Sequence, residues 1–214
     1  MIVDFHCHTT ASDGALPPHE LVARASRNGV ELLAITDHDT LDAYRGLVPG
    51  DGMQLIPGIE LSCQWQKRGI HIVGLNVDRA SAAMAEALVH QGSARRERAD
   101  MIAAKLEKYG VESPLSGAQA IADGATLGRP HFARYLVQCD FVKSEKEAFK
   151  KYLGSGKPCD IKVCWPETQQ VIEWIRGAGG TAVLAHPGKY KLTRSRLIGY
   201  VEEFQRWGGQ GMEI

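Results

Sequence analysis

The stretch VDFHCHTTASDG, residues 3–14, places two histidines and an aspartate directly after a short apolar run. Successive side chains of a strand point to opposite faces, so His6 and His8 share one face and Cys7 takes the other. Two imidazoles at the end of a strand can hold one cation, and Asp13 adds a carboxylate nearby. An ordinary pair of histidines is the alternative, and the rest of the chain must decide between the two.

The composition of the 214-residue chain is that of an ordinary globular protein, with 44% hydrophobic and 23% charged residues. Lys and Arg balance Asp and Glu at 25 each, so no global field attracts nucleic acid or a membrane, and anion binding must be local. No run reaches the roughly 18 to 20 apolar residues of a membrane span, and no signal-peptide pattern opens the sequence. The five cysteines include no C-x-x-C pair. We expect a cytoplasmic protein with reduced thiols and no membrane partner.

Short β-rich runs alternate with helical stretches over residues 1–79, which is typical of a parallel α/β arrangement. Residues 80–160 are rich in Ala, Glu and Arg with helical periodicity, and no strand stands out there. The α/β rhythm resumes over 161–214. We therefore predict an α/β domain interrupted by a small helical insertion. Strands are expected at MIVDF (1–5), ELLAITDH (31–38), MQLIPGIELS (53–62), GIHIVGLNV (69–77) and TAVLAH (181–186), with GMEI (211–214) opening another.

Further metal-binding side chains fall at or near the ends of the expected strands. His38 follows the run LLAIT, Glu60 interrupts the apolar run IPGIELS, and His186 ends TAVLAH. An acid inside such a run is costly unless it is paired or coordinated. The active site of a parallel α/β barrel lies at the C-terminal ends of several strands. We therefore predict that these three residues converge with His6 and His8.

Two more histidines are candidates, although their positions differ. His71 lies early in its expected strand, and His131, in GRPHFAR, starts an expected helix and would have to reach over the barrel mouth. Plainer alternatives exist, because His38 could cap a strand, Glu60 could pair with a buried arginine, and His131 could be an ordinary helix-start histidine. Together these alternatives require several coincidences at strand ends and loop starts, so the metal interpretation is favoured.

Six segments, DFHCHTTASDG, AITDHDT, PGIELS, GIHIVGL, GRPHFA and LAHP, resemble in order and spacing the polymerase-and-histidinol-phosphatase (PHP) superfamily. The resemblance covers essentially the whole chain and is strongest to small bacterial phosphoesterases that act on nucleotide 3',5'-bisphosphates and short RNA. It implies a distorted (β/α)7 barrel holding two or three divalent metals, with Mn expected and Fe or Zn as alternatives. It also implies that a metal-activated water attacks a phosphate ester.

The resemblance also implies a role for each candidate. The ligand sets are His6, His8 and Glu60 for one metal, Glu60, His71 and His131 for a second, and Asp13 with His38 for a third. His186 corresponds to a histidine near the scissile phosphate, acting as proton donor or phosphate contact. The family also places an Asp-x-His run near the chain end, whereas this sequence stops at GMEI. We therefore expect that the last strands of the barrel are missing from it, with ligands of the first and third metals.

An anionic substrate needs cationic groups besides the metals. Arg129, which we also expect to act in catalysis beside His186, is the first candidate for a bidentate phosphate contact. Arg134 and Lys157, the latter in the loop GSGKP, are further candidates, and a solvated surface charge is the alternative for each. The insertion would act as a lid that selects a small phosphorylated nucleotide or short single-stranded RNA over a duplex. The oligomeric state is left open.

The function predicted first is hydrolysis of the 3'-phosphate of nucleoside 3',5'-bisphosphates, together with 5'-to-3' trimming of short oligoribonucleotides. Histidinol-phosphate phosphatase is the enzymatic alternative, and the insertion and the GRPHFA run speak against it only by resemblance. A metal-binding structural or regulatory domain is the non-enzymatic alternative, which the nearly complete set of ligands disfavours.

Overall fold

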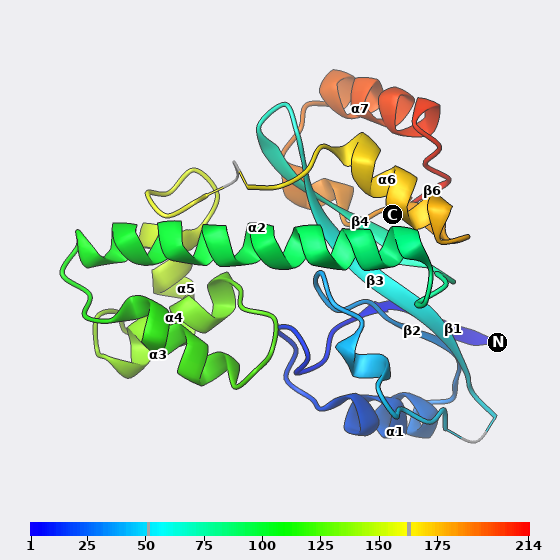
Figure 1. Cartoon of the computed structure of the whole chain (residues 1–214), viewed down its shortest axis with the longest axis horizontal. Coiled ribbons are helices and arrows are strands. Elements are labelled where there is room, and N and C mark those ends of the chain that lie inside the picture. Colours follow the sequence, from blue (N-terminus) through cyan, green and yellow to red (C-terminus); the bar gives the residue numbers. More distant parts are fainter. Residues whose placement is uncertain (51, 162–163) are drawn as a thin grey trace. The chain divides into compact units, whose positions relative to one another are not determined.

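The computed structural model describes residues 1–50, 52–161 and 164–214 (Figure 1). Their contacts divide the chain into two compact units, Met1–Gln91 with Trp165–Ile214, and Gly92–Cys164. The first unit contains the sheet and the second is helical. The first boundary, between Gln91 and Gly92, falls inside one continuous helix, α2 (Ala82–Glu107).

A curled, mixed sheet of six strands in the order β1-β2-β3-β4-β5-β6 forms the centre of the first unit (Figure 1). Its strands are β1 (Ile2–Cys7), β2 (Val30–Ile35), β3 (Gln54–Trp65), β4 (Arg68–Leu75), β5 (Thr181–Leu184) and β6 (Gly211–Met212). All six overlap segments in which a strand is expected from the sequence. The pairs β1–β2, β2–β3 and β5–β6 are parallel. The expected α/β fold is therefore confirmed.

The expectation of a parallel arrangement is wrong at β4, which pairs antiparallel with both β3 and β5. Gln66 and Lys67, at φ 47° and 62°, form a two-residue connection that joins β3 directly to β4. Such a turn reverses the chain at once, whereas a parallel connection needs a crossover of a dozen or more residues. As a result the start of β4 lies beside the end of β3, with His71 opposite Ser62.

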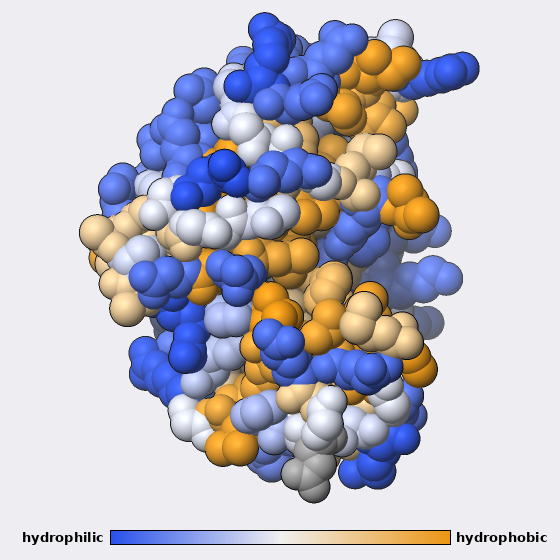
Figure 2. Space-filling model, turned by 90° about the vertical axis from the view of Figure 1, so that its right-hand side faces the viewer, coloured by the Kyte–Doolittle hydropathy of each residue, from blue (hydrophilic) through white to orange (hydrophobic). Residues whose placement is uncertain are grey.

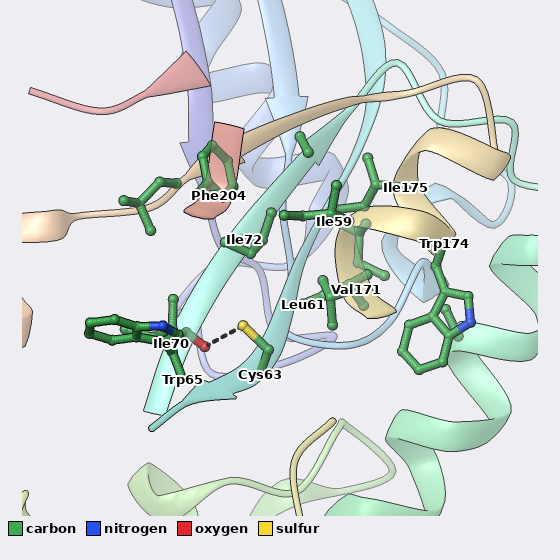
Figure 3. Close-up of a cluster of buried hydrophobic side chains, with 14 of the residues drawn as sticks. Ile59, Leu61, Cys63, Trp65, Ile70, Ile72, Val171, Trp174, Ile175 and Phe204 are labelled. Atoms are coloured by element: carbon green, nitrogen blue, oxygen red, sulfur yellow. Dashed lines mark hydrogen bonds between the residues drawn. The ribbon is translucent and has the colours of Figure 1, made fainter. Parts of the chain in front are cut away.

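Alternate residues of β3 and β4 build the main hydrophobic core (Figure 3). The core side chains labelled there are Ile59, Leu61, Cys63 and Trp65 of β3, Ile70 and Ile72 of β4, Val171, Trp174 and Ile175 of α6 (Thr168–Gly177), and Phe204 of α7 (Arg194–Arg206). Side chains of a strand alternate between faces, and the core takes the odd-numbered residues of β3. The even-numbered residues, among them Glu60, therefore face the other side of the sheet.

A second cluster of apolar side chains packs α1 (Pro18–Arg27) against β2. Val22 and Ala25 of the helix are buried with Leu33 and Ile35 of the strand. The helix begins at a proline, whose missing N–H costs nothing in the first turn. Two short 3₁₀ segments, η1 (Asp42–Tyr44) and η3 (Pro187–Tyr190), lie in the loops that follow β2 and β5.

The helical unit Gly92–Cys164 has a core of its own. Besides the second part of α2 it contains α3 (Pro114–Ala122), α4 (Arg129–Gln138), α5 (Glu145–Ala148) and the π-helical turn η2 (Phe149–Leu153). Leu106 of α2 packs with Phe132 and Leu136 of α4 in this core. The described elements of this unit are all helical.

The two outer strands of the sheet carry exposed apolar side chains. Figure 2 views the side on which both chain ends lie in Figure 1, and hydrophobic residues there are interspersed with hydrophilic ones. Ile2 and Val3 of β1 and Met212 of β6 are among the exposed apolar residues. Within the described ranges, no helix has the length and apolarity needed to cross a membrane.

Candidate metal centre

The end of β1 places two imidazoles on one face. His6 is in the strand and His8 follows it, and their Nε2 atoms lie 3.2 Å apart. The intervening Cys7 points away, and its thiol donates to the carbonyl of Ala34 on β2. The two-residue spacing therefore brings two nitrogen donors together, as the alternation of strand side chains predicts.

The loop after His8 carries Asp13 back towards the histidines. The N–H of Gly14 donates to the carbonyl of Thr9 over 2.9 Å, and a Cβ at Gly14 would overlap the His8 carbonyl, so only glycine fits there. Asp13 Oδ1 lies 3.8 Å from His8 Nδ1, and its Oδ2 lies 3.8 Å from His38 Nε2. One carboxylate thus faces imidazoles from two strand ends.

Asp37 braces this loop against the end of β2. Its carboxylate accepts hydrogen bonds from the Thr9 N–H at 2.7 Å and from the hydroxyls of Thr9 and Ser12, both at 2.5 Å. Burial raises the pKa of Asp37, and these hydrogen bonds oppose that rise. The hydrogen bonds between the Asp37 carboxylate and described residues all come from this loop, so Asp37 holds the loop in place.

The segment after β2 continues alongside β3 and so brings His38 next to Glu60. The Glu60 N–H donates to the Asp37 carbonyl over 3.2 Å, and the Asp39 N–H donates to the Glu60 carbonyl over 3.0 Å. The Asp39 carboxylate in turn accepts from the N–H and the hydroxyl of Ser62, at 2.7 and 2.8 Å. These hydrogen bonds hold the segment after β2 beside β3, so that His38 and Glu60 are neighbours.

Five imidazoles surround the Glu60 carboxylate, whose residue is 0% exposed. The nitrogens nearest Oε2 are His6 Nε2 (3.3 Å), His8 Nε2 (3.2 Å) and His38 Nδ1 (3.1 Å), and those nearest Oε1 are His71 Nδ1 (3.0 Å) and His186 Nε2 (2.8 Å). His71 reaches this place because β4 runs antiparallel, which puts its early residues beside the C-terminal ends of the parallel strands. His71 therefore joins the cluster from an early position in its strand, whereas the other four histidines lie near or after the ends of theirs.

The imidazoles set the protonation of the carboxylate. Burial alone would raise the pKa of Glu60, but the surrounding imidazoles, with His38 and His71 contributing most by charge, hold it well below its usual range. Burial likewise would lower the pKa of His6, yet Glu60 and Glu213 together raise it to about 9. The site therefore holds a carboxylate that is ionised at neutral pH, as metal coordination requires.

The donor atoms have the spacing of ligands around shared ions. Three groups offer ligand atoms within 4.8 Å of one another: His6, Glu60 and His186; His8, Asp13 and His38; His38, Glu60 and His71. Donors bound to one ion at about 2.0–2.2 Å lie roughly 3 Å apart, which matches the distances around Glu60 Oε2. That buried oxygen forms no hydrogen bond with any described residue although three nitrogens lie within 3.3 Å. Histidine and carboxylate donors crowded in this way fit divalent metal ions.

Glu213 is a residue of the centre that the sequence interpretation missed. It follows β6, and its Oε1 lies 2.5 Å from Nδ1 of His6, while its Oε2 accepts from the N–H of His186 at 2.6 Å. The available signal was the acid in the expected strand GMEI, which is the same signal that singled out Glu60.

Four of the candidate residues belong to the Gly92–Cys164 unit, namely Arg129, His131, Arg134 and Lys157. His131 is buried at the start of α4, and its Nδ1 accepts from the Gly128 N–H at 3.0 Å. The guanidinium of Arg129 donates to the Leu153 carbonyl at 3.0 Å and to Asp160 at 3.4 Å, and burial lowers its pKa. The two other cations are Arg134, 3.8 Å from Glu145, and Lys157, which is exposed.

Known proteins resemble the chain over nearly its whole length. The family model of the PHP domain matches residues 4–157. A protein of Haemophilus influenzae named 5'-3' exoribonuclease is 46% identical over 99% of this chain and 78% of its own length. A protein of Chromobacterium violaceum named 3',5'-nucleoside bisphosphate phosphatase is 39% identical over 99% of this chain and 76% of its own.

Solved structures share the fold as well. A Chromobacterium violaceum protein described as an amidohydrolase, solved with sulfate and no metal, superposes with a TM-score of 0.89 at 37% identity, covering 99% of this chain and 76% of that one. A Bifidobacterium adolescentis protein described as a candidate metal-dependent phosphoesterase has a TM-score of 0.82 at 26% identity, with coverage of 98% and 76%. Both matches span the sheet-containing and the helical segments of the sequence.

Proposed function

This chain belongs to the PHP family of metal-dependent phosphoesterases, and from that premise we propose that it hydrolyses the 3'-phosphate of nucleoside 3',5'-bisphosphates. The observation that carries the proposal is Glu60, a fully buried carboxylate with imidazoles against both of its oxygens. The names of the relatives support a nucleotide or RNA substrate. The exoribonuclease relatives favour a second activity, the 5'-to-3' trimming of short oligoribonucleotides.

We propose two or three divalent ions, Mn first and Fe or Zn as alternatives. The residues that would hold them are His6, His8, Asp13, His38, Glu60 and His71, whose donor atoms gather in the sheet-containing unit. His131 is a further proposed ligand, which only the resemblance to the family supplies. Histidine mixed with carboxylate suits these metals better than Mg, which prefers an octahedron of oxygens. When bound, such ions activate a water molecule and neutralise charge on the phosphoryl group.

The side chains of the chain supply the remaining chemistry. A carboxylate only accepts hydrogen bonds, so His186 Nε2, 2.8 Å from Glu60 Oε1, carries a proton. His186 is our candidate for protonating the leaving oxygen or contacting the phosphate. Arg129, held by Leu153 and Asp160, is our candidate for a fixed phosphate contact, because a guanidinium binds phosphate through two parallel N–H groups. Arg134 and Lys157 are our further candidates for contacts with the phosphate.

Phosphate release from adenosine 3',5'-bisphosphate with added Mn²⁺ tests the proposal. We expect turnover by the wild-type chain and a loss of roughly 100-fold or more in Glu60→Gln, because metals contribute several kcal/mol to the transition state and each 1.4 kcal/mol is tenfold in rate. Glu20→Gln, an exposed acid on α1, is the matched control and should keep its rate. Normal turnover in Glu60→Gln would remove the carboxylate from the mechanism.

Two further substrates separate the candidate functions. Release of nucleoside monophosphates from the 5' end of a short oligoribonucleotide would support the second activity. Hydrolysis of histidinol phosphate without hydrolysis of the bisphosphate would overturn the proposal in favour of the alternative enzyme. Metal binding without hydrolysis of any of the three would favour a structural or regulatory domain.

A further inference from the structure

The carboxylate of Glu213 lies next to the metal centre because the backbone around it is held by the sheet. Met212 pairs with Leu184 in the parallel β5–β6 ladder, and the Glu213 N–H donates to the Leu184 carbonyl at 3.0 Å. Both strands end at the edge of the sheet where the imidazoles gather. Strand pairing therefore places the backbone of Glu213 beside the imidazoles.

One oxygen of Glu213 contacts the far side of His6. Its Oε1 lies 2.5 Å from His6 Nδ1, whereas His6 Nε2 faces Glu60 Oε2 at 3.3 Å and His8 Nε2 at 3.2 Å. Because a carboxylate only accepts, the proton of a neutral His6 ring is held on Nδ1, and the lone pair stays on Nε2. That is the tautomer in which His6 can donate its lone pair to an ion beside Glu60.

The other oxygen of Glu213 holds the backbone of a second imidazole. Its Oε2 accepts from the His186 N–H at 2.6 Å. His186 has φ 29°, a backbone conformation that non-glycine residues adopt only at a cost. The hydrogen bond helps to hold this conformation, from which His186 Nε2 reaches Glu60 Oε1 at 2.8 Å.

We propose that Glu213 is a positioning residue for the metal centre, which orients His6 through its side chain and His186 through its backbone. The inference rests on the proposed role of His6 as a metal ligand. A carboxylate behind a ligating histidine orients the ring and raises its basicity, and removing such a partner typically costs 10–100-fold in metal affinity. The Glu213 carboxylate contacts His6 Nδ1 and the His186 N–H, whereas the Nε2 atoms of both rings face Glu60. Its effect on a bound metal therefore passes through the two histidines.

Titration of the whole chain with Mn²⁺ alone tests the inference, with free Mn²⁺ followed by electron paramagnetic resonance. Glu213→Gln should weaken at least one Mn²⁺ site by about 10–100-fold, because an amide has one acceptor oxygen for two N–H donors. Met212→Ala, the exposed neighbour on β6, controls for disturbance of the strand and should bind Mn²⁺ within about twofold of wild type. Saturating Mn²⁺ should restore most of the phosphate release of Glu213→Gln.

The result that overturns the inference is an unchanged Mn²⁺ affinity in Glu213→Gln, or an equal loss of affinity in Met212→Ala. Thermal unfolding without metal checks that each variant is folded, and Glu213→Gln keeps the side-chain volume if Glu213→Ala does not fold. The titration uses no substrate. A wild-type chain that binds Mn²⁺ but releases no phosphate would therefore refute the proposed function without deciding the role of Glu213.

Discussion

The hydroxyl of Tyr44 is a single group that joins β2 to β3 just before both strands reach the metal centre. It accepts from the N–H of Ile35 at 3.0 Å and of Gly58 at 2.8 Å, and it lies 2.7 Å from the Ile35 carbonyl and 2.9 Å from that of Ile56. Burial raises the pKa of Tyr44, so the hydroxyl stays neutral and able to donate. His38 and Glu60 lie within three residues of these contacts.

Tyr44→Phe should lower the free energy of unfolding by about 1–3 kcal/mol for each buried N–H left without a partner. Chemical denaturation of the metal-free chain measures this change. Tyr135→Phe is the matched control, since its hydroxyl makes one exposed bond to the Glu112 carbonyl, and we expect a change within about 0.5 kcal/mol. Equal stabilities of the two variants would show that Tyr44 does not tie the strands.

At the scale of elements, the centre depends on how closely β3 approaches β2. Gly58 lies where a Cβ would come within 2.9 Å of a Thr36 methyl, 3.0 Å of the Ile35 carbonyl oxygen and 3.2 Å of the Ala34 Cβ. Two of these neighbours belong to β2, whose backbone is held by pairing on both sides. The glycine therefore lets the strand that carries Glu60 sit against the segment that carries His38.

Gly58→Ala should destabilise the chain by about 1–3 kcal/mol, because the added methyl must push the strands apart. For a chain of this length the melting temperature should fall by roughly 2–4 °C per kcal/mol, measured by calorimetry. Gly69→Ala in β4 adds a methyl with no neighbour within 4 Å and should leave the melting temperature nearly unchanged. A melting temperature for Gly58→Ala equal to that of Gly69→Ala would contradict the close approach.

At the scale of the molecule, the metal centre connects parts of the chain that are far apart in sequence. His6 and Glu213, whose side chains are in contact, are separated by 207 residues. The imidazoles around Glu60 come from β1, β4 and the segments that follow β1, β2 and β5. An ion bound at these residues would join most of the strands of the sheet, and an unfolded chain offers no such preformed site.

Mn²⁺ should therefore raise the thermal stability of the chain. If the unfolded chain does not bind Mn²⁺, one site raises the free energy of unfolding by about 2.7 kcal/mol when the Mn²⁺ concentration is 100 times the dissociation constant. Calorimetry with and without Mn²⁺ measures the shift, and a chelator should reverse it. Glu60→Gln should lose most of the shift. A melting temperature that does not respond to Mn²⁺ would contradict metal binding at this centre.

Local patterns in the sequence determined much of this protein. The two-residue spacing of His6 and His8 predicts a shared face because strand side chains alternate, and the acid inside IPGIELS marks Glu60 because burial of an unpaired carboxylate is costly. The strands and most of the helices follow from similar short-range periodicities. Such features depend only on neighbouring residues, so they can be read before any fold is known.

Tertiary structure alone decided how these pieces meet. The direction of β4, and with it the place of His71, depends on Gln66 and Lys67, which adopt positive φ. Neither is a glycine, so the sequence does not indicate a tight turn there. The contact of Glu213 with His6 requires the curled sheet to bring β6 towards β1, and no local pattern encodes a pairing over that separation. The physical reason is that alternation sets the face of a side chain, whereas strand order and sheet curvature set its neighbours.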